Sequence, residues 1–123
     1  MKNGAALLIV DVQNDFCPGG ALAVPDGDRV VEPLSRAAGY FAAAGLPVLA
    51  SRDWHPSVTK HFSGFGGVWP PHCVQDSSGA AFHPALRLPE GTRFISTMDS
   101  PSLLKRRSDP GQVRFERNDR LLE

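Results

Sequence analysis

Short apolar runs separated by longer polar stretches mark the first hundred residues of the chain. The run from Ala5 to Val10 is continuously apolar, which is the pattern of a strand covered on both faces in a parallel sheet. A second run covers Pro47 to Ala50, and a third candidate strand covers Thr92 to Ser96. The pattern therefore predicts three strands, and an acidic residue, Asp11 or Asp53, follows each of the first two.

Between the first two predicted strands, apolar residues recur at helical spacing from about Arg29 to Ala44. Gly45 then stands where helices commonly end on a left-handed residue. Pro33 falls early in this stretch, so the helix either begins near Glu32 or carries a kink. Strand, helix and strand with close connections form a right-handed crossover unit, which predicts an α/β fold with a parallel sheet.

Acidic side chains at the carboxyl ends of strands have two readings. A lone aspartate there often caps a helix or belongs to a loop. In open α/β sheets, however, ligands bind beyond these same strand ends. His55 follows Asp53 by two residues, and because side chains alternate along an extended segment, both would lie on one side of it. This pairing favours a site at Asp53.

The stretch from 56 to 79 is rich in glycine and proline and shows no helical or strand pattern, so it is predicted to be a long loop. Loops of this length in compact domains are usually functional. It carries His61 and His72, which would return to the strand ends and join Asp53 and His55. One carboxylate and three imidazoles suit a first-row metal ion. The alternative is a set of solvent-facing loop histidines.

The composition of the chain limits the kinds of molecule that we expect it to bind. The chain has 123 residues and equal numbers of acidic and basic side chains, which suits one domain with a small neutral substrate. This charge balance favours neither nucleic acid nor an anionic membrane. The first apolar run is too short to span a bilayer. Two cysteines, Cys17 and Cys73, make no disulfide framework, so we expect free thiols and a cytoplasmic location.

Five segments between about Ala5 and Ser96 carry a further pattern, and they are Asp11–Leu22, Ser51–Pro56, His61–Phe62, Trp69–Gln75 and Gly79–Pro84. Together they resemble one enzyme family, the nicotinamidase (pyrazinamidase) branch of the isochorismatase-like cysteine hydrolases. The resemblance runs from about Ala5 to Ser96. It implies a three-layer parallel sheet flanked by helices, truncated here after about three strands. It also implies hydrolysis of nicotinamide to nicotinate and ammonia, with pyrazinamide as a second substrate.

The resemblance assigns roles by position. The residues that match the family's ligands for one divalent metal ion, zinc or iron, are Asp53, His55, His61 and His72. Phe16 and Trp69 match the aromatic residues that line the substrate ring, where stacking on a flat heteroaromatic is favourable. Asp11 matches the acid that takes the proton from a cysteine nucleophile.

Two members of the family's catalytic triad are not matched. The family's lysine falls at Thr97 in this chain, and its nucleophilic cysteine falls beyond Glu123. Neither Cys17 nor Cys73 stands in register for the nucleophile, and both read as small buried residues. We therefore predict that these 123 residues alone do not release ammonia from nicotinamide.

The composition changes abruptly towards the end of the chain. Of the 26 charged residues, 10 lie between Ser100 and Glu123. We therefore divide the chain into a hydrolase part, residues 1–99, and a charged tail, residues 100–123. A solvated helix, a disordered end and a change of reading frame near Ser96 to Ser100 are the three interpretations of this tail.

Three functional hypotheses remain after the sequence analysis. In the first hypothesis, the chain is the metal-binding and ring-binding half of a nicotinamidase-type amidohydrolase. Related hydrolases of the same fold, which act on isochorismate or carbamoyl amides, are the alternative within this hypothesis. Alternatively, it is a noncatalytic, metal-dependent binder of nicotinamide-like rings, or a truncated product without function. The last follows from the exposed edge of a cut parallel sheet, which would also favour a homo-oligomer.

Overall fold

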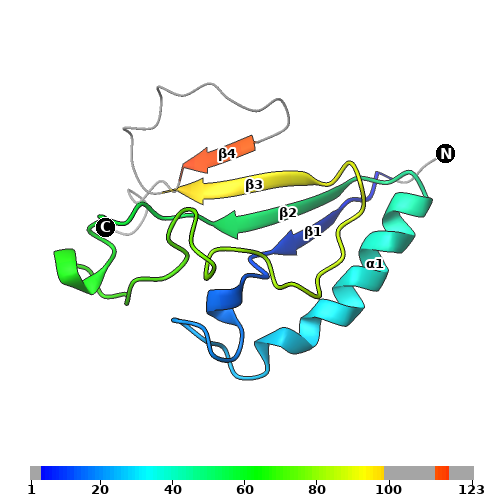
Figure 1. The fold of residues 1–123 in the computed structure, drawn as a ribbon. Helices are drawn as coiled ribbons and strands as arrows, with labels where there is room; N and C mark the ends of the chain where they lie inside the picture. Colours follow the sequence, from blue (N-terminus) through cyan, green and yellow to red (C-terminus); the bar gives the residue numbers. More distant parts are fainter. Residues whose placement is uncertain (1–3, 99–112, 117–123) are drawn as a thin grey trace.

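The computed structural model describes residues 4–98 and 113–116. Within them a single four-stranded sheet forms, in the order β1-β2-β3-β4, and every neighbouring pair is parallel (Figure 1). The strands are β1 (Leu7–Val10), β2 (Val48–Asp53), β3 (Arg93–Met98) and β4 (Val113–Glu116). The predicted α/β class with a parallel sheet is confirmed.

One helix, α1 (Val31–Ala43), connects β1 to β2 and lies along one face of the sheet (Figure 1). The 3-10 turn η2 (Gly27–Val30) leads into it. Pro33 lies in the first turn of α1, where its missing N–H costs no helical hydrogen bond. The helix therefore begins near Glu32, which was one of the two predicted alternatives, and Gly45 follows it with a φ of 70°.

The core lies between α1 and the sheet. Its buried members come from α1, from β1 and β2, and from the segment after β1, and they are Ile9, Val12, Val31, Ala38, Val48 and Ala50. Because side chains alternate along a strand, the neighbours of Ile9 point to the opposite face. Leu8 and Val10 there are 52% and 60% exposed. Among the described residues, α1 is the one α-helix, so the sheet is covered by a helix on one face.

The strands extend further towards the site than the apolar runs indicated. β2 continues through Asp53 because it stays paired with β3 as far as Thr97. The fourth strand, β4, was not expected, since it lies in the predicted charged tail. The other tail residues lie outside the described residues, so the division into residues 1–99 and 100–123 stays a prediction.

The connections between β2 and β3 fold back over the strand ends. Isolated bridges pair His55 with Val74 and Phe62 with Trp69. The 3-10 turn η3 (Ser63–Phe65) closes the loop between the second pair. A third bridge ties Gln13, just before the turn η1 (Asn14–Phe16), to Phe82. No helix in the described part of the chain is long and apolar enough to cross a bilayer.

Candidate metal centre and its cavity

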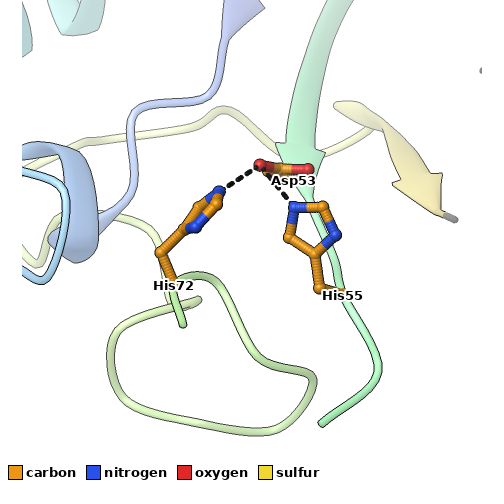
Figure 2. Close-up of side chains that lie close together, drawn as sticks. All are labelled: Asp53, His55 and His72. Carbon is orange, nitrogen blue, oxygen red and sulfur yellow. Dashed lines mark ion pairs between the residues drawn. The ribbon is translucent and has the colours of Figure 1, made fainter. Parts of the chain in front are cut away.

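Asp53 is the residue on which the site converges. At the end of β2, its Oδ2 atom lies 2.9 Å from Nε2 of His55 and 3.2 Å from Nε2 of His72 (Figure 2). The period of two in an extended segment brings His55 to this side, as predicted. His72 returns from the long loop. The donor atoms of the three residues lie within 4.8 Å of one another.

His72 is oriented by its second ring nitrogen. Its Nδ1 lies 2.7 Å from the carbonyl oxygen of Pro70. A carbonyl only accepts hydrogen bonds, so Nδ1 carries the proton and donates. In the neutral imidazole this leaves the Nε2 lone pair directed towards Asp53, which is the arrangement that metal-binding histidines use.

A phenyl ring that the sequence analysis did not single out as a site residue packs against two of the histidines. Phe62 is fully buried, and its ring centroid lies 5.3 Å from that of His55 and 5.6 Å from that of His72. The two imidazoles themselves meet edge to face at 4.9 Å. Phe62 thus limits the rotation of both rings. The signal in the sequence was its position directly after His61.

A cavity of about 190 Å³ opens in front of these donors. This is smaller than the roughly 300–1,000 Å³ of pockets for drug-sized molecules, and it suits one small ring. All seven predicted site residues line it, together with Leu22: Asp11, Phe16, Asp53, His55, His61, Trp69 and His72. Phe16 and Trp69 lie with ring centroids 5.8 and 6.5 Å from that of His72.

Asp11 stands at the end of β1 in a left-handed conformation, with a φ of 53°. Aspartate tolerates this region better than most residues. Its Oδ1 accepts a hydrogen bond of 2.7 Å from the hydroxyl of Ser51, the β2 residue two positions before Asp53. The turn after β1 and the end of β2 are therefore tied together at the cavity.

The donor set fits a divalent metal ion. A carboxylate oxygen and two imidazole nitrogens converge on one point, and His55 and His72 are almost fully buried. Nitrogen and oxygen ligands of this kind suit zinc and other first-row metals. Among the described residues, two carboxylates and no lysine or arginine line the cavity, which favours a cation. His61 lines the same cavity but lies outside the three-residue donor group.

The position at which the family's lysine was expected does face the site. Thr97 is paired with Asp53 in the sheet, and its hydroxyl lies 3.4 Å from Oδ1 of that carboxylate. A threonine hydroxyl brings no positive charge there. The nearest cationic side chain along β2, Arg52, bonds Ser96 and stacks on Trp54 instead.

Both cysteines are buried and free. Burial, together with the nearby carboxylates of Asp53, Asp15 and Asp11, raises the pKa of the Cys73 thiol well above its ordinary value. Burial and then the charge of Asp28 raise the pKa of Cys17. Cys17 lines a second, larger cavity of about 390 Å³, separate from the metal donors.

The chain is similar to one domain family and to several characterised proteins. The isochorismatase domain family matches residues 5–103. A nicotinamidase of Escherichia coli (strain K12) is 46% identical over an alignment of 96 positions, and the match covers 66% of this chain and 45% of the relative. The solved pyrazinamidase of Pyrococcus horikoshii in complex with zinc is 44% identical, with a TM-score of 0.72 over 76% of this chain and 51% of that one.

A third similar protein is PnC1 from L. infantum, solved in complex with nicotinate. It is 37% identical, with a TM-score of 0.53 over 74% of this chain and 46% of that chain. The chain thus spans about half the length of the relatives that it matches.

Proposed function

Since the chain belongs to the isochorismatase domain family, we propose that it forms the metal-binding and ring-binding half of a nicotinamidase-type amidohydrolase. The reaction is hydrolysis of nicotinamide to nicotinate and ammonia, with pyrazinamide as a second substrate. The observation that carries this proposal is the convergence of Asp53, His55 and His72 at a small cavity that Phe16 and Trp69 flank. The similar proteins named above support the same substrate class.

Each lining residue has a defined task in this proposal. Asp53, His55 and His72, with His61 as a fourth ligand, would hold a divalent ion, which would supply Lewis-acid chemistry at the ring nitrogen. Phe16 and Trp69 hold the flat ring by offset stacking.

Asp11, held by Ser51, accepts a proton from a thiol nucleophile. In the described part of the chain neither thiol has this role, because Cys17 and Cys73 are buried and both pKa values are raised.

A noncatalytic binder of nicotinamide-like rings is the second candidate. It is favoured by a donor set and aromatic flank that stand without an accessible thiol in the described residues. Both candidates require metal-dependent ligand binding, and they differ in whether a longer protein carrying this half turns the ligand over. Two free thiols suit a reducing compartment, and we place the protein in the cytoplasm.

Calorimetric titration of the 123-residue chain tests the proposal. We expect nicotinamide to bind the zinc-loaded chain and to lose affinity after treatment with a chelator. Benzamide is the matched ligand, since it keeps the ring and the carboxamide but lacks the ring nitrogen. Zinc should therefore strengthen nicotinamide binding and leave benzamide binding unchanged.

Variants of the same chain complete the test. Asp53→Asn should lower zinc affinity by more than about 100-fold, because even residues that only support the ligands cost about 10–100-fold. Asp76→Asn is the matched control, as Asp76 is outside the cavity lining and asparagine tolerates its φ of 63°. We expect no ammonia from any of these chains. Ammonia release that disappears with Asp11→Ala, or equal zinc affinity for Asp53→Asn and the control, would contradict the proposal.

A further inference from the structure

One side chain satisfies both backbone polar groups of Asp53. Gln13 is fully buried, and its Oε1 accepts a hydrogen bond of 2.8 Å from the Asp53 amide. Its Nε2 donates to the Asp53 carbonyl and to the Ala80 carbonyl, both at 2.8 Å. All three of these hydrogen bonds join the side-chain amide of Gln13 to backbone groups. The peptide units on both sides of the Asp53 Cα are therefore held by one amide.

Beyond the end of β1, the side chain of Gln13 makes the hydrogen bonds to Asp53 that a neighbouring strand would make. The pairing of β1 with β2 ends at Val10 and Ser51, and Asp11 adds one more backbone bond to the Ser51 carbonyl. Asp53 lies two residues further along β2, beyond the end of β1. On that side its N–H and C=O meet the side-chain amide of Gln13, which carries the same donor and acceptor as a peptide group. The orientation of the metal-binding carboxylate thus depends on this amide.

Asp15 holds the backbone next to His72, as Gln13 holds the backbone at Asp53. Its Oδ2 accepts a hydrogen bond of 2.8 Å from the Cys73 amide, which belongs to the peptide bond after His72. Cys73 has a φ of 46°, in the left-handed region that cysteine rarely adopts. A charge-assisted hydrogen bond of this kind is stronger than a neutral one, and it holds the strained residue in place.

The neighbourhood of Asp15 is built closely around its carboxylate. Its Oδ1 accepts from the Ala21 amide at 3.1 Å. A Cβ atom added at Gly79 would clash with the carboxylate oxygens of Asp15, so only glycine leaves room for the carboxylate in this position. The Asp15 amide also donates to the Gly79 carbonyl. The side chain therefore has little freedom to release Cys73.

We propose that Gln13 and Asp15 are positioning residues for the metal centre, which hold the backbone at Asp53 and at His72 so that their donor atoms converge. The inference rests on the proposed function only in requiring that the chain bind a metal. Neither residue supplies a ligand atom to the three-residue donor group. Each acts on a different ligand, so both are needed to bring the carboxylate and the His72 imidazole within 3.2 Å.

A merely structural role makes a different prediction. A buried polar side chain that only joins two segments should affect unfolding and leave metal affinity unchanged once the protein is folded. Ser35 provides this case away from the site: it is buried, donates to the Val31 carbonyl and accepts from the Arg87 amide. Ser35→Ala is therefore the matched control for loss of a buried clamp.

The experiment measures zinc affinity of the full chain by competition with a coloured chelator, for variants whose folding is checked by circular dichroism. Gln13→Met keeps the length of the side chain and removes its hydrogen bonds, and we expect a loss of about 10–100-fold. Asp15→Ala should lose a similar factor. Asp15→Asn should recover part of it, because it keeps an oxygen for Cys73 while it lacks the charge. Ser35→Ala should stay within about twofold, a difference well below 1 kcal/mol.

A spectrum separates positioning from stability. Cobalt(II) in place of zinc has visible absorption bands that report ligand geometry, and we expect these bands to change in Gln13→Met and not in Ser35→Ala. Unchanged affinity and spectrum in Gln13→Met and Asp15→Ala would overturn this inference while leaving the proposed function intact. Failure of the parent chain to bind zinc would overturn both. If Gln13→Met does not fold, the contrast between Asp15→Ala and Asp15→Asn decides the question.

Discussion

Cys17 and Cys73 lie inside the segments that build the site, yet neither has the surroundings of a nucleophile. They are 5% and 0% exposed, and burial raises the pKa of both thiols. A thiol that stays protonated attacks a carboxamide poorly. At the scale of single residues, the described chain therefore brings together groups that could hold a metal and aromatic side chains that line a cavity, without a reactive sulfur.

We expect both thiols to react with iodoacetamide far more slowly in the native chain than in the chain unfolded in urea. Because the pKa values are raised, little thiolate is present near neutral pH, and burial also excludes the reagent. Mass spectrometry of the labelled chain over time gives both rates, and Cys17→Ser and Cys73→Ser assign them. Native labelling of either thiol at the unfolded rate would contradict the assignment of both as inert.

What could be predicted at this scale follows from chemistry that is local in sequence. Asp53 and His55 are two residues apart in an extended segment, so their convergence needs no tertiary information. Gln13 and Phe62 carry no metal chemistry of their own. Gln13 meets the backbone of Asp53 across 40 positions of sequence, once β1 and β2 are paired. Phe62 meets both histidine rings once the long loop folds back. His61 lines the cavity, and its role as a ligand stays a prediction.

Among the elements, α1 was predicted most closely, because its apolar spacing and the glycine after it are local signals. It runs from Val31 to Ala43 and buries Val31, Ser35 and Ala38 against the sheet. The bounds of the strands were less accurate. The end of β2 is determined by its partner strand, and no pattern within residues 51–53 reports that partner.

Gly39 within α1 and Gly45 just after it should respond in opposite directions to alanine. Gly39 is helical and exposed, and an added Cβ meets nothing within 4 Å, so Gly39→Ala should stabilise the fold by about 0.5–1 kcal/mol. Gly45 has a φ of 70°, so Gly45→Ala should destabilise it by about 1 kcal/mol. Urea unfolding of both variants measures the changes. Stabilisation by Gly45→Ala would contradict the role given to its left-handed conformation, and destabilisation by Gly39→Ala would contradict the prediction for the helix interior.

The molecule as a whole is a parallel sheet whose first strand lies at an edge (Figure 1). β1 pairs with β2 on one side, and among the described strands none pairs with its other side. Leu8 and Val10 point away from α1 and are more than half exposed. An apolar edge of this kind is a template for pairing with a second chain. The predicted homo-oligomer would form here.

Replacing Leu8 and Val10 together by lysine should reduce association, because charges along an edge oppose pairing. Sedimentation velocity at several concentrations compares this double variant with the parent chain. Val68→Lys is the control, since Val68 is 83% exposed in a loop outside the sheet. We expect the control to associate like the parent. Equal association of all three chains would exclude the β1 edge as the interface.

At this scale the sequence indicated three strands and missed the fourth. β4 lies among charged residues, and their density indicated a tail. Its pairing with β3 aligns Val113 with Ile95, a contact between distant parts of the chain that no local pattern encodes. The order of the first three strands was more accessible, because a helical crossover in the first unit favours parallel neighbours.

The three converging donors, finally, all come from residues 53–72. A cation bound there ties off a short loop, and the entropy of closing a loop grows only by about 0.6 kcal/mol for each doubling of its length. An ion held by these donors would therefore act as a local cross-link, because it would close a segment of the chain that lies entirely before β3.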